Sequence, residues 1–333
     1  NPAVVTVDGS GQLTYTGVGT AVVMVYEENY DLYTLLEVEV VPYNSTYYEE
    51  DGTQVVFPVA PEVLAGAEFS VALTAEGTVW TWGSNRYMQL GTQQQNTDYV
   101  AVHQQVKTGQ GTGMANIVDI AAGDNFALAV DANGAVWAWG RNERGSLGQN
   151  LEASYSGNLM VPLQVYDPTG SATLGGENTG KIVKVYAHGY SAAAISEDGS
   201  VYVWGDNREN HMGLAPDLYG SGMYGRPRKV PGIDNAVEIY FASDKMYILT
   251  ADGMLYASGS TAEGLTSYET APYGDVQQYA QPILNSEAQA SGDGLDYFKG
   301  VALAALGENQ ALILTMEYDE NLVIGVDSTA VGG

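Results

Sequence analysis

Histidine is the side chain most often used for acid–base catalysis and metal binding, and the chain contains three: His103, His188 and His211. No two of them stand at a spacing that would place both on one metal ion. The chain also has no cysteine, no Gly-x-Ser-x-Gly nucleophile turn and no phosphate-binding P-loop. These observations predict no catalytic residue, no metal and no cofactor. The first interpretation is therefore a protein that is not an enzyme.

Carboxylates are the remaining groups that could do chemistry, because the chain has 40 aspartates and glutamates and a glycosidase needs only two. No pair stands out from the turns in the sequence. The stretches Asp131–Gly134 and Asp8–Gly11 resemble parts of calcium loops, but neither completes the ligand pattern and turn chemistry explains both. Asn44-Ser45-Thr46 matches a glycosylation acceptor, a triplet that is common by chance.

The charge of the chain limits its partners. A formal net charge of −28 repels nucleic acid and anionic lipid, so we predict no nucleic-acid partner. No apolar run is long enough to cross a bilayer, so we predict no membrane insertion. The absence of cysteine together with strong acidity favours a protein exported by a bacterium or archaeon. The predicted location is therefore extracellular or at the cell surface.

A hairpin pattern recurs four times at intervals of about 60 residues, which is the length of a four-stranded propeller blade. In each copy an apolar strand is followed by a turn and by a second strand that ends in Trp-Gly or Ser-Gly. Both faces of the second strand are apolar, so each hairpin needs cover on both sides. A weaker fifth copy runs from Val301 to Gly325, with its two apolar runs at Ala311–Leu314 and Leu322–Gly325. The turns, which we expect to be type I′ with both central residues at positive φ, are Glu76-Gly77, Asn133-Gly134, Asp198-Gly199 and Asp252-Gly253.

A loop with an asparagine and a final Leu-Gly or Met-Gly follows three of these hairpins, over 83–91, 140–148 and 205–213. With these loops the chain resembles the regulator of chromosome condensation repeat family over roughly residues 55–325. The resemblance implies a β-propeller of about seven such units. The chain departs from the family where Phe69, Phe126 and Tyr190 replace a histidine, and copy four lacks the asparagine and the final Leu-Gly.

The front of the chain is different. It has Asn1-Pro2, a Val7-Asp8 turn, a Gly17–Ala21 strand start and a third strand over 36–41. It resembles the second half of a bacterial immunoglobulin-like group 2 domain. The predicted fold class is therefore all-β: a partial immunoglobulin-like β-sandwich at 1–42, a linker at 43–54 and a β-propeller at 55–333. Half a sandwich and five units leave open strand edges, so we expect the chain to be part of a longer one or to self-associate through these edges.

Three predicted loops, over 149–181, 214–236 and 265–299, interrupt the repeats. Insertions in repeat folds gather on one face, which is often the binding face, and tyrosine offers much contact area for little lost entropy. These loops predict a surface that binds a protein or a glycan. The candidate partner-binding residues are Tyr155, Tyr166, Tyr219, Tyr224, Tyr268, Tyr273, Tyr279 and Tyr297.

Four hypotheses for function remain. The first is a cell-surface binding or adhesion scaffold. The second is a secreted inhibitor or regulator of a partner enzyme, because the resembled family includes secreted propellers of that kind. The third is nucleotide exchange on a small GTPase, which the eukaryotic members of the family imply, and the fourth is an enzyme.

Overall fold

The computed structural model describes the chain in parts. Its side chains are described at 59, 61–94, 98–149, 157–214, 222–242, 244–260, 280–283 and 301. Only the backbone is described for strand residues at 5–7, 13–15, 19–27, 32–40, 47–48, 54–55, 97, 276–279, 302–306, 311–317 and 325–331.

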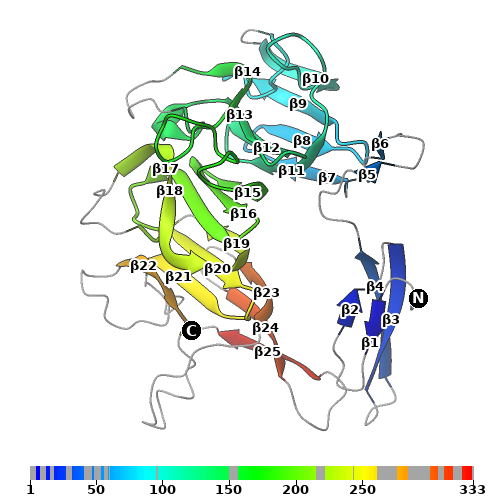
Figure 1. The fold of residues 1–333 in the computed structure, drawn as a ribbon. Helices are drawn as coiled ribbons and strands as arrows, with labels where there is room; N and C mark the ends of the chain where they lie inside the picture. The colour runs from blue at the N-terminus through cyan, green and yellow to red at the C-terminus, as the bar shows by residue number, and fades with distance from the viewer. Residues whose placement is uncertain are drawn as a thin grey trace.

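Four antiparallel sheets of four strands and one of three strands follow one another along an arc (Figure 1). Each sheet is a blade, and its first strand is the innermost. Blade 1 contains β7 (Glu62–Ala65), β8 (Phe69–Leu73), β9 (Val79–Asn85) and β10 (Thr97–Gln105). Blade 2 contains β11 (Ile117–Ala122), β12 (Phe126–Asp131), β13 (Val136–Gly140) and β14 (Leu159–Gln164), with a single 3-10 turn, η1 (Glu143–Gly145), in the loop between β13 and β14. Blade 3 contains β15 (Ile182–His188), β16 (Ser191–Ser196), β17 (Ser200–Asn207) and β18 (Gly222–Asp234). Blade 4 contains β19 (Ala236–Ala242), β20 (Lys245–Thr250), β21 (Leu255–Ser260) and β22 (Val276–Pro282), and the fifth sheet contains β23 (Val301–Leu306), β24 (Ala311–Glu317) and β25 (Gly325–Val331).

The core lies between blades, because both faces of each central strand are apolar. In β12, Leu128 and Val130 pack toward blade 3, whereas Ala127 and Ala129 pack toward blade 1, and all four are fully buried. Strand side chains alternate between the two faces of a sheet, so one strand serves two interfaces. The prediction of an all-β fold with regulator-of-chromosome-condensation-type propeller blades is confirmed.

The hairpin turns differ from the expected type I′ turn. In the blade 2 turn, Gly134 has φ of +88°, whereas Asn133 is not among the residues with positive φ. The backbone N–H of Asp131 donates to Ala135 and the N–H of Gly134 donates to Asp131. This is a longer loop with one left-handed glycine, so the Gly is required but the residue before it is not. The free choice at that position explains why Glu, Asn and Asp all occur there.

The three long segments expected to be loops contain the fourth, outer strand of their blades. Strand β14 lies within 149–181, β18 within 214–236 and β22 within 265–299. These outer strands alternate apolar and polar residues weakly, so their pattern is close to that of a loop. The prediction of loops is wrong for these parts of the three segments.

The third strand of the fifth sheet is also later than predicted. Backbone pairing runs from Glu317 opposite Gly325 to Ala311 opposite Val331, so β25 begins where the predicted strand ends. The short apolar run at 322–324 did not determine the strand, because the register is set by pairing with β24.

The front of the chain forms two backbone hairpins beside the arc (Figure 1). Strand β1 (Val5–Val7) pairs with β2 (Leu13–Tyr15), and β3 (Gly19–Glu27) pairs with β4 (Leu32–Val40). A further pair, β5 (Tyr47–Tyr48) and β6 (Gln54–Val55), lies in and beside the expected linker. The immunoglobulin-like resemblance and the domain boundaries stay predictions. Among the described residues, no helix is long and apolar enough to cross a membrane.

Trp82, Trp139 and Trp204 stand at equivalent positions of the repeat, which predicts that all three are core residues. Trp139 and Trp204 are fully buried, which confirms this for blades 2 and 3. Trp82 is only half-buried and lines a hollow of about 340 Å³ with Trp80 and His103. The indole ring of Trp82 points away from blade 2, and among the described residues no blade covers this ring. The prediction that Trp82 is a core residue is therefore wrong.

Replacing Trp139 with Ala should lower the free energy of unfolding by roughly 3–5 kcal/mol, because a fully buried indole leaves a cavity. The matched change Trp82→Ala should cost clearly less, since that ring is half-exposed. Denaturant unfolding of both variants measures the difference. Equal losses would contradict the packing described for blades 1 and 2.

Candidate functional site

Of the eight predicted tyrosines, only Tyr166 and Tyr224 have described side chains, and these two do not share one surface. Tyr166 lies just after β14 and is 37% exposed, whereas Tyr224 is 7% exposed and packs into the core between blades 3 and 4. Tyr279 lies in β22, where only the backbone is described. The prediction of a partner contact is wrong for Tyr224, because its strand position faces the interior. The other predicted residues, Tyr155, Tyr219, Tyr268, Tyr273 and Tyr297, lie outside the described residues.

The loops after the Trp-Gly strands form a rigid face instead. In each loop the side-chain carbonyl of the repeated asparagine accepts a backbone N–H five residues later. The three asparagines are buried, so this bond is protected from water. The residue that donates is itself a buried apolar anchor. The pairs are Asn85 with Leu90 (3.1 Å), Asn142 with Leu147 (3.1 Å) and Asn207 with Met212 (2.9 Å).

Each of these loops is also held by the next blade. The indole N–H of Trp139 donates to the carbonyl of Gln89 (3.0 Å), and that of Trp204 donates to the carbonyl of Ser146 (2.9 Å). In blade 4, Ser258 takes the place of the Trp, and its hydroxyl donates to the carbonyl of His211 (2.6 Å). Every loop is therefore fixed by its own asparagine and by the following blade.

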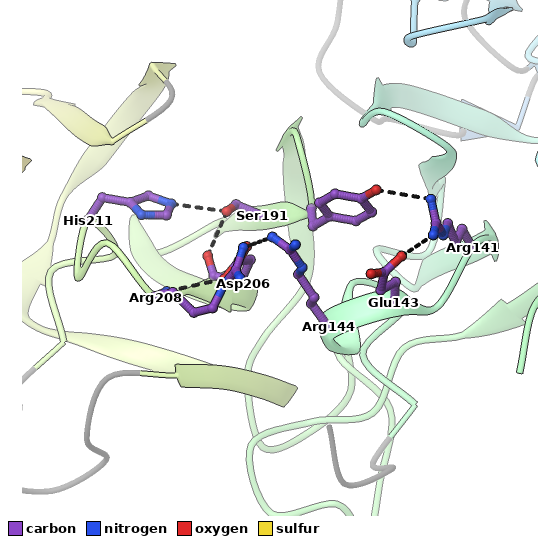
Figure 2. Close-up of polar contacts among 8 residues, drawn as sticks. Arg141, Glu143, Arg144, Ser191, Asp206, Arg208 and His211 are labelled. Carbon is purple, nitrogen blue, oxygen red and sulfur yellow. Dashed lines mark hydrogen bonds and ion pairs between the residues drawn. The ribbon is translucent and has the colours of Figure 1, made fainter. Parts of the chain in front are cut away.

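On this loop face, side chains from three blades form one continuous group, which we call the arginine–tyrosine stack. Figure 2 shows its members from blades 2 and 3. The Arg141 guanidinium lies 4.0 Å from the centre of the Tyr87 ring and 5.6 Å from that of Tyr190, and its Nη1 donates to the Tyr190 hydroxyl (3.0 Å). Arg144 lies 4.7 Å from the same Tyr190 ring. Stacked guanidinium and aromatic groups of this kind gain from cation–π attraction.

Two carboxylates complete the stack. Glu143 pairs with Arg141, and Asp206 pairs with both Arg144 and Arg208. Burial raises the pKa of Asp206, while Arg144 acts in the opposite direction and Glu143 adds to the rise. The side chains of Arg141 and Arg144 are each 25% exposed and that of Arg208 is 50% exposed. The stack is thus ordered by its own contacts and remains open to solvent.

The register of blade 3 explains how Tyr190 reaches this face. When the repeat copies of the chain are aligned with one another, Tyr190 takes the same position as Phe69 and Phe126. In the sheets, however, Phe69 pairs with Gly83 and Phe126 with Gly140, whereas Ser191 pairs with Gly205. Tyr190 is one residue earlier, so it lies outside the strand. The alignment was wrong by one residue, and a shift of one moves a side chain to the other face.

Sequence reasoning missed the whole stack. A signal was present, because four of the six arginines in the chain, Arg86, Arg141, Arg144 and Arg208, lie in the three asparagine loops. This concentration of arginines, in a chain of net charge −28, indicates that the three loops need positive charge.

His211, a buried histidine beneath the stack, contacts a serine hydroxyl as a catalytic histidine would, but the hydrogen bonds of the pair do not suit catalysis. His211 Nε2 lies 3.0 Å from the Ser191 hydroxyl, and that hydroxyl donates to the carbonyl of Asp206 (2.7 Å). The serine proton is therefore committed to the backbone, and His211 must be the donor to the serine. Both side chains are at most 5% exposed, out of reach of a substrate. We interpret this pair as a structural link within blade 3, between the loop residue His211 and the backbone of Asp206.

The central channel holds a second polar group. The first strands of blades 1 to 4 place Glu62, Asp119, Lys184 and Glu238 at the same register position, beside a cavity of about 500 Å³. Lys184 pairs with Glu238 (2.5 Å), and Asp119 accepts the N–H of Val185 (2.7 Å). Burial raises the pKa of Asp119 to about 7. Within the part of the chain that the structure describes, no group of three or more potential ligands is arranged to hold a metal ion.

The suspected calcium stretch at 131–134 is a turn. The Asp131 carboxylate accepts the backbone N–H groups of Asn133 and Ala135 and the indole N–H of Trp137. These bonds occupy both of its oxygens, as turn chemistry predicts. The other stretch, at 8–11, lies outside the described residues.

Comparison with known proteins agrees with this fold. Regulator of chromosome condensation (RCC1) repeat models match residues 76–130, 133–195 and 117–146. Residues 76–195 are therefore similar to RCC1 repeats, and the fold is that of an RCC1-type propeller. In Prp20p of Saccharomyces cerevisiae, a solved structure with a TM-score of 0.55 and 18% identity, the similarity covers 76% of this chain and 55% of that one.

Two curated relatives show the same repeats. Protein pim1 of Schizosaccharomyces pombe is 27% identical over 242 residues, 70% of this chain and 42% of that protein. The RCC1 domain-containing protein RUG3, mitochondrial, of Arabidopsis thaliana is 31% identical over 157 residues, 47% of this chain and 31% of that protein. The chain thus spans less than half the length of these relatives.

These findings overturn the predicted location. The relatives are proteins of eukaryotes, one is named as mitochondrial, and Prp20p is described by its binding to histones, which are intracellular. The prediction of an extracellular or surface protein of a bacterium or archaeon is therefore wrong. It rested on acidity and on the absence of cysteine. Acidity promotes solubility in any compartment, and proteins of reducing compartments need no disulfides.

Replacing Asp119 with Asn should make stability less dependent on pH. The folded pKa of Asp119 is raised to about 7 from 3.8, so its contribution is full below pH 4 and is lost as the pH rises through 7. At pH 8 the variant should be more stable than the wild type by roughly 1–3 kcal/mol, with no gain at pH 4. Thermal unfolding across this range measures it. The exposed Asp98→Asn change is the control and should show no such trend.

His211 should give the opposite dependence of stability on pH. Burial, with His188 nearby, lowers its pKa from 6.5 to about 4, so its contribution is present above pH 6.5 and is lost as the pH falls toward 4. His211→Gln keeps an N–H for Ser191 and removes the titration. Between pH 6.5 and 4 the wild type should lose roughly 1–3 kcal/mol more than this variant. The exposed His103→Gln change should behave as the wild type does, and identical slopes for all three proteins would refute the assignment.

Proposed function

We propose that the protein is a non-enzymatic binding scaffold, in which the loop face of blades 1 to 3 holds and regulates a partner protein. The observation that carries the proposal is the arginine–tyrosine stack. Arginine and tyrosine are among the residue types most enriched at the energetic centres of protein interfaces. Here they are partly exposed and already held in position, so binding would cost little side-chain entropy.

The similar proteins support a protein as the partner. Prp20p is described by its binding properties to Gsp1p and histones, both of which are proteins. The RCC1 repeat models carry the description of a regulator. A regulator of a partner enzyme is therefore part of the proposal, and nucleotide exchange on a GTPase is one form that such regulation takes. Nothing in the described residues supports a glycan partner or self-association, so neither is part of it.

The buried Ser191 and His211 support the non-enzymatic character, because their hydrogen bonds are structural. The absence of an activity and of a cofactor stays a prediction. Nucleic acid stays excluded from the proposal by the net charge of −28, which opposes phosphate contacts over most of the surface.

The proposal is tested by chemical cross-linking of the full chain in extract of its source cells, followed by quantitative mass spectrometry. The double change Arg141→Ala and Tyr190→Ala removes the centre of the stack. We expect proteins captured by the wild type to fall at least about tenfold with this variant, the size of a 1.4 kcal/mol loss. The control is Arg86→Ala, because Arg86 lies in the same set of loops but is 60% exposed and outside the stack. Equal capture by all three proteins, with unchanged melting temperatures, would place the partner elsewhere.

A further inference from the structure

We propose that the β3–β4 hairpin at the front of the chain docks on the uncovered face of blade 1 and so covers the open end of the arc. We call this surface the tryptophan face. Backbone pairing places on it Val63, Ala65, Ser70, Ala72, Trp80 and Trp82. The inference is independent of the proposed function, because the loop face that carries the arginine–tyrosine stack is a different surface of the blades.

The repeat itself shows what the tryptophan face is built to do. Trp80 and Trp82 stand at the register positions of Trp137 and Trp139 in blade 2. In blade 2 this face packs against blade 1, and Trp139 is fully buried there. In blade 1 both tryptophans are only half-buried and Val63 is 67% exposed. The tryptophan face is therefore a packing surface that no blade covers among the described residues.

The chemistry of this face requires an apolar occupant. No aspartate, glutamate, lysine or arginine lines the hollow of about 340 Å³ beside the two tryptophans. The indole N–H of Trp80 already donates to the Thr78 hydroxyl (3.0 Å), and its ring meets that of His103 edge to face at 5.4 Å. The groups that remain open are ring faces and methyl groups, which gain most from contact with another apolar surface.

The β3–β4 hairpin offers such a surface. Its two strands pair without a register shift, so residues can be assigned to its two sides from the backbone. One side is apolar at successive pairs, which include Ala21 with Val38 and Val23 with Leu36. The other side carries two acidic residues, Glu37 and Glu39. A two-stranded hairpin is at best marginally stable in water, so its apolar side needs a second sheet against it.

The hairpin is tethered close to the tryptophan face. After β4 the chain rejoins blade 1 at Val59, whose N–H donates to the carbonyl of Ala75 between β8 and β9 (3.0 Å). The intervening residues, 41–58, reach up to roughly 60 Å when extended. Figure 1 shows β3 and β4 on the side where the arc is open, below blade 1. A short tether gives a local concentration in the millimolar range, so a modest apolar contact suffices for docking.

One contact would thus cover two surfaces that both need cover. Any other occupant of the tryptophan face would leave the apolar side of the hairpin without a sheet. A two-stranded hairpin covers less of a sheet than a four-stranded blade does, so Trp82 gains less from this contact than Trp139 gains from blade 1.

The absence of cysteine makes a direct test possible, because two introduced cysteines are then the only thiols in the full chain. Val38→Cys with Ala72→Cys joins the apolar side of the hairpin to the tryptophan face, and a short bis-maleimide should link them within one chain. The matched pair, Glu37→Cys with Ala72→Cys, differs only in the side of the hairpin. It should react at least about tenfold more slowly, as measured by peptide mass spectrometry.

Tryptophan fluorescence provides a second measurement on the full chain. Val38→Glu places a charge on the apolar side of the hairpin, so acrylamide should quench Trp80 and Trp82 more strongly than in the wild type. Thr20→Glu places the same charge on the opposite side and should leave the quenching unchanged. The difference between the two variants should disappear when Trp80 and Trp82 are both replaced with Phe.

Three results would overturn the inference. Equal reaction rates of the two cysteine pairs, or equal quenching in the two glutamate variants, would show that the hairpin does not dock through its apolar side. Cross-links between two chains in place of links within one would assign the tryptophan face to a second copy. Tryptophans that are protected from acrylamide in a chain that forms no cross-link would assign this face to another part of the protein.

Discussion

The hydrogen bond from a tryptophan of one blade to a loop carbonyl of the blade before it is the interaction on which this architecture depends. Trp139 and Trp204 each combine a fully buried ring with an indole N–H that reaches across the interface. The ring supplies apolar burial and the N–H satisfies a carbonyl that would otherwise be buried without a partner. Gly91 has to be a glycine for the same reason, because a Cβ there would lie 2.7 Å from Trp139. One residue type thus joins the blades and fixes the loop face.

The proposed binding function depends on this rigidity of the loop face. The buried asparagine holds each loop from below and the next blade holds it from the side, so the side chains between them project from a fixed backbone. The positions beside the asparagine are then free to vary. They carry Ser84, Arg141 and Asp206 in successive blades, and in blades 2 and 3 these residues meet around Tyr190. A conserved scaffold with a variable surface is the usual arrangement by which one fold serves different partners.

Polar residues replace the interior phenylalanine of the repeat in blades 3 and 4. Phe69 and Phe126 fill the interior in blades 1 and 2, whereas the equivalent residues Ser191 and Lys245 are polar and equally buried. Ser191 bonds to His211, and Lys245 bonds to Asp244 (2.8 Å). Buried polar groups are tolerated only with partners, and each of these bonds satisfies a polar residue within its own blade. Apolar packing still joins blades 3 and 4.

The sequence by itself determined the blade. Alternating apolar residues, a glycine at each turn and a repeated Trp-Gly specify a two-faced hairpin, and these signals are local, so they are visible in one chain. The outer strands, the place of β25 and the one-residue shift at Tyr190 were decided by pairing with neighbouring strands, which local composition does not encode. The candidate site was decided by tertiary structure alone. Tyr87, Arg141, Tyr190 and Asp206 come from different loops of the chain, and only the stacking of successive blades brings these loops to one face.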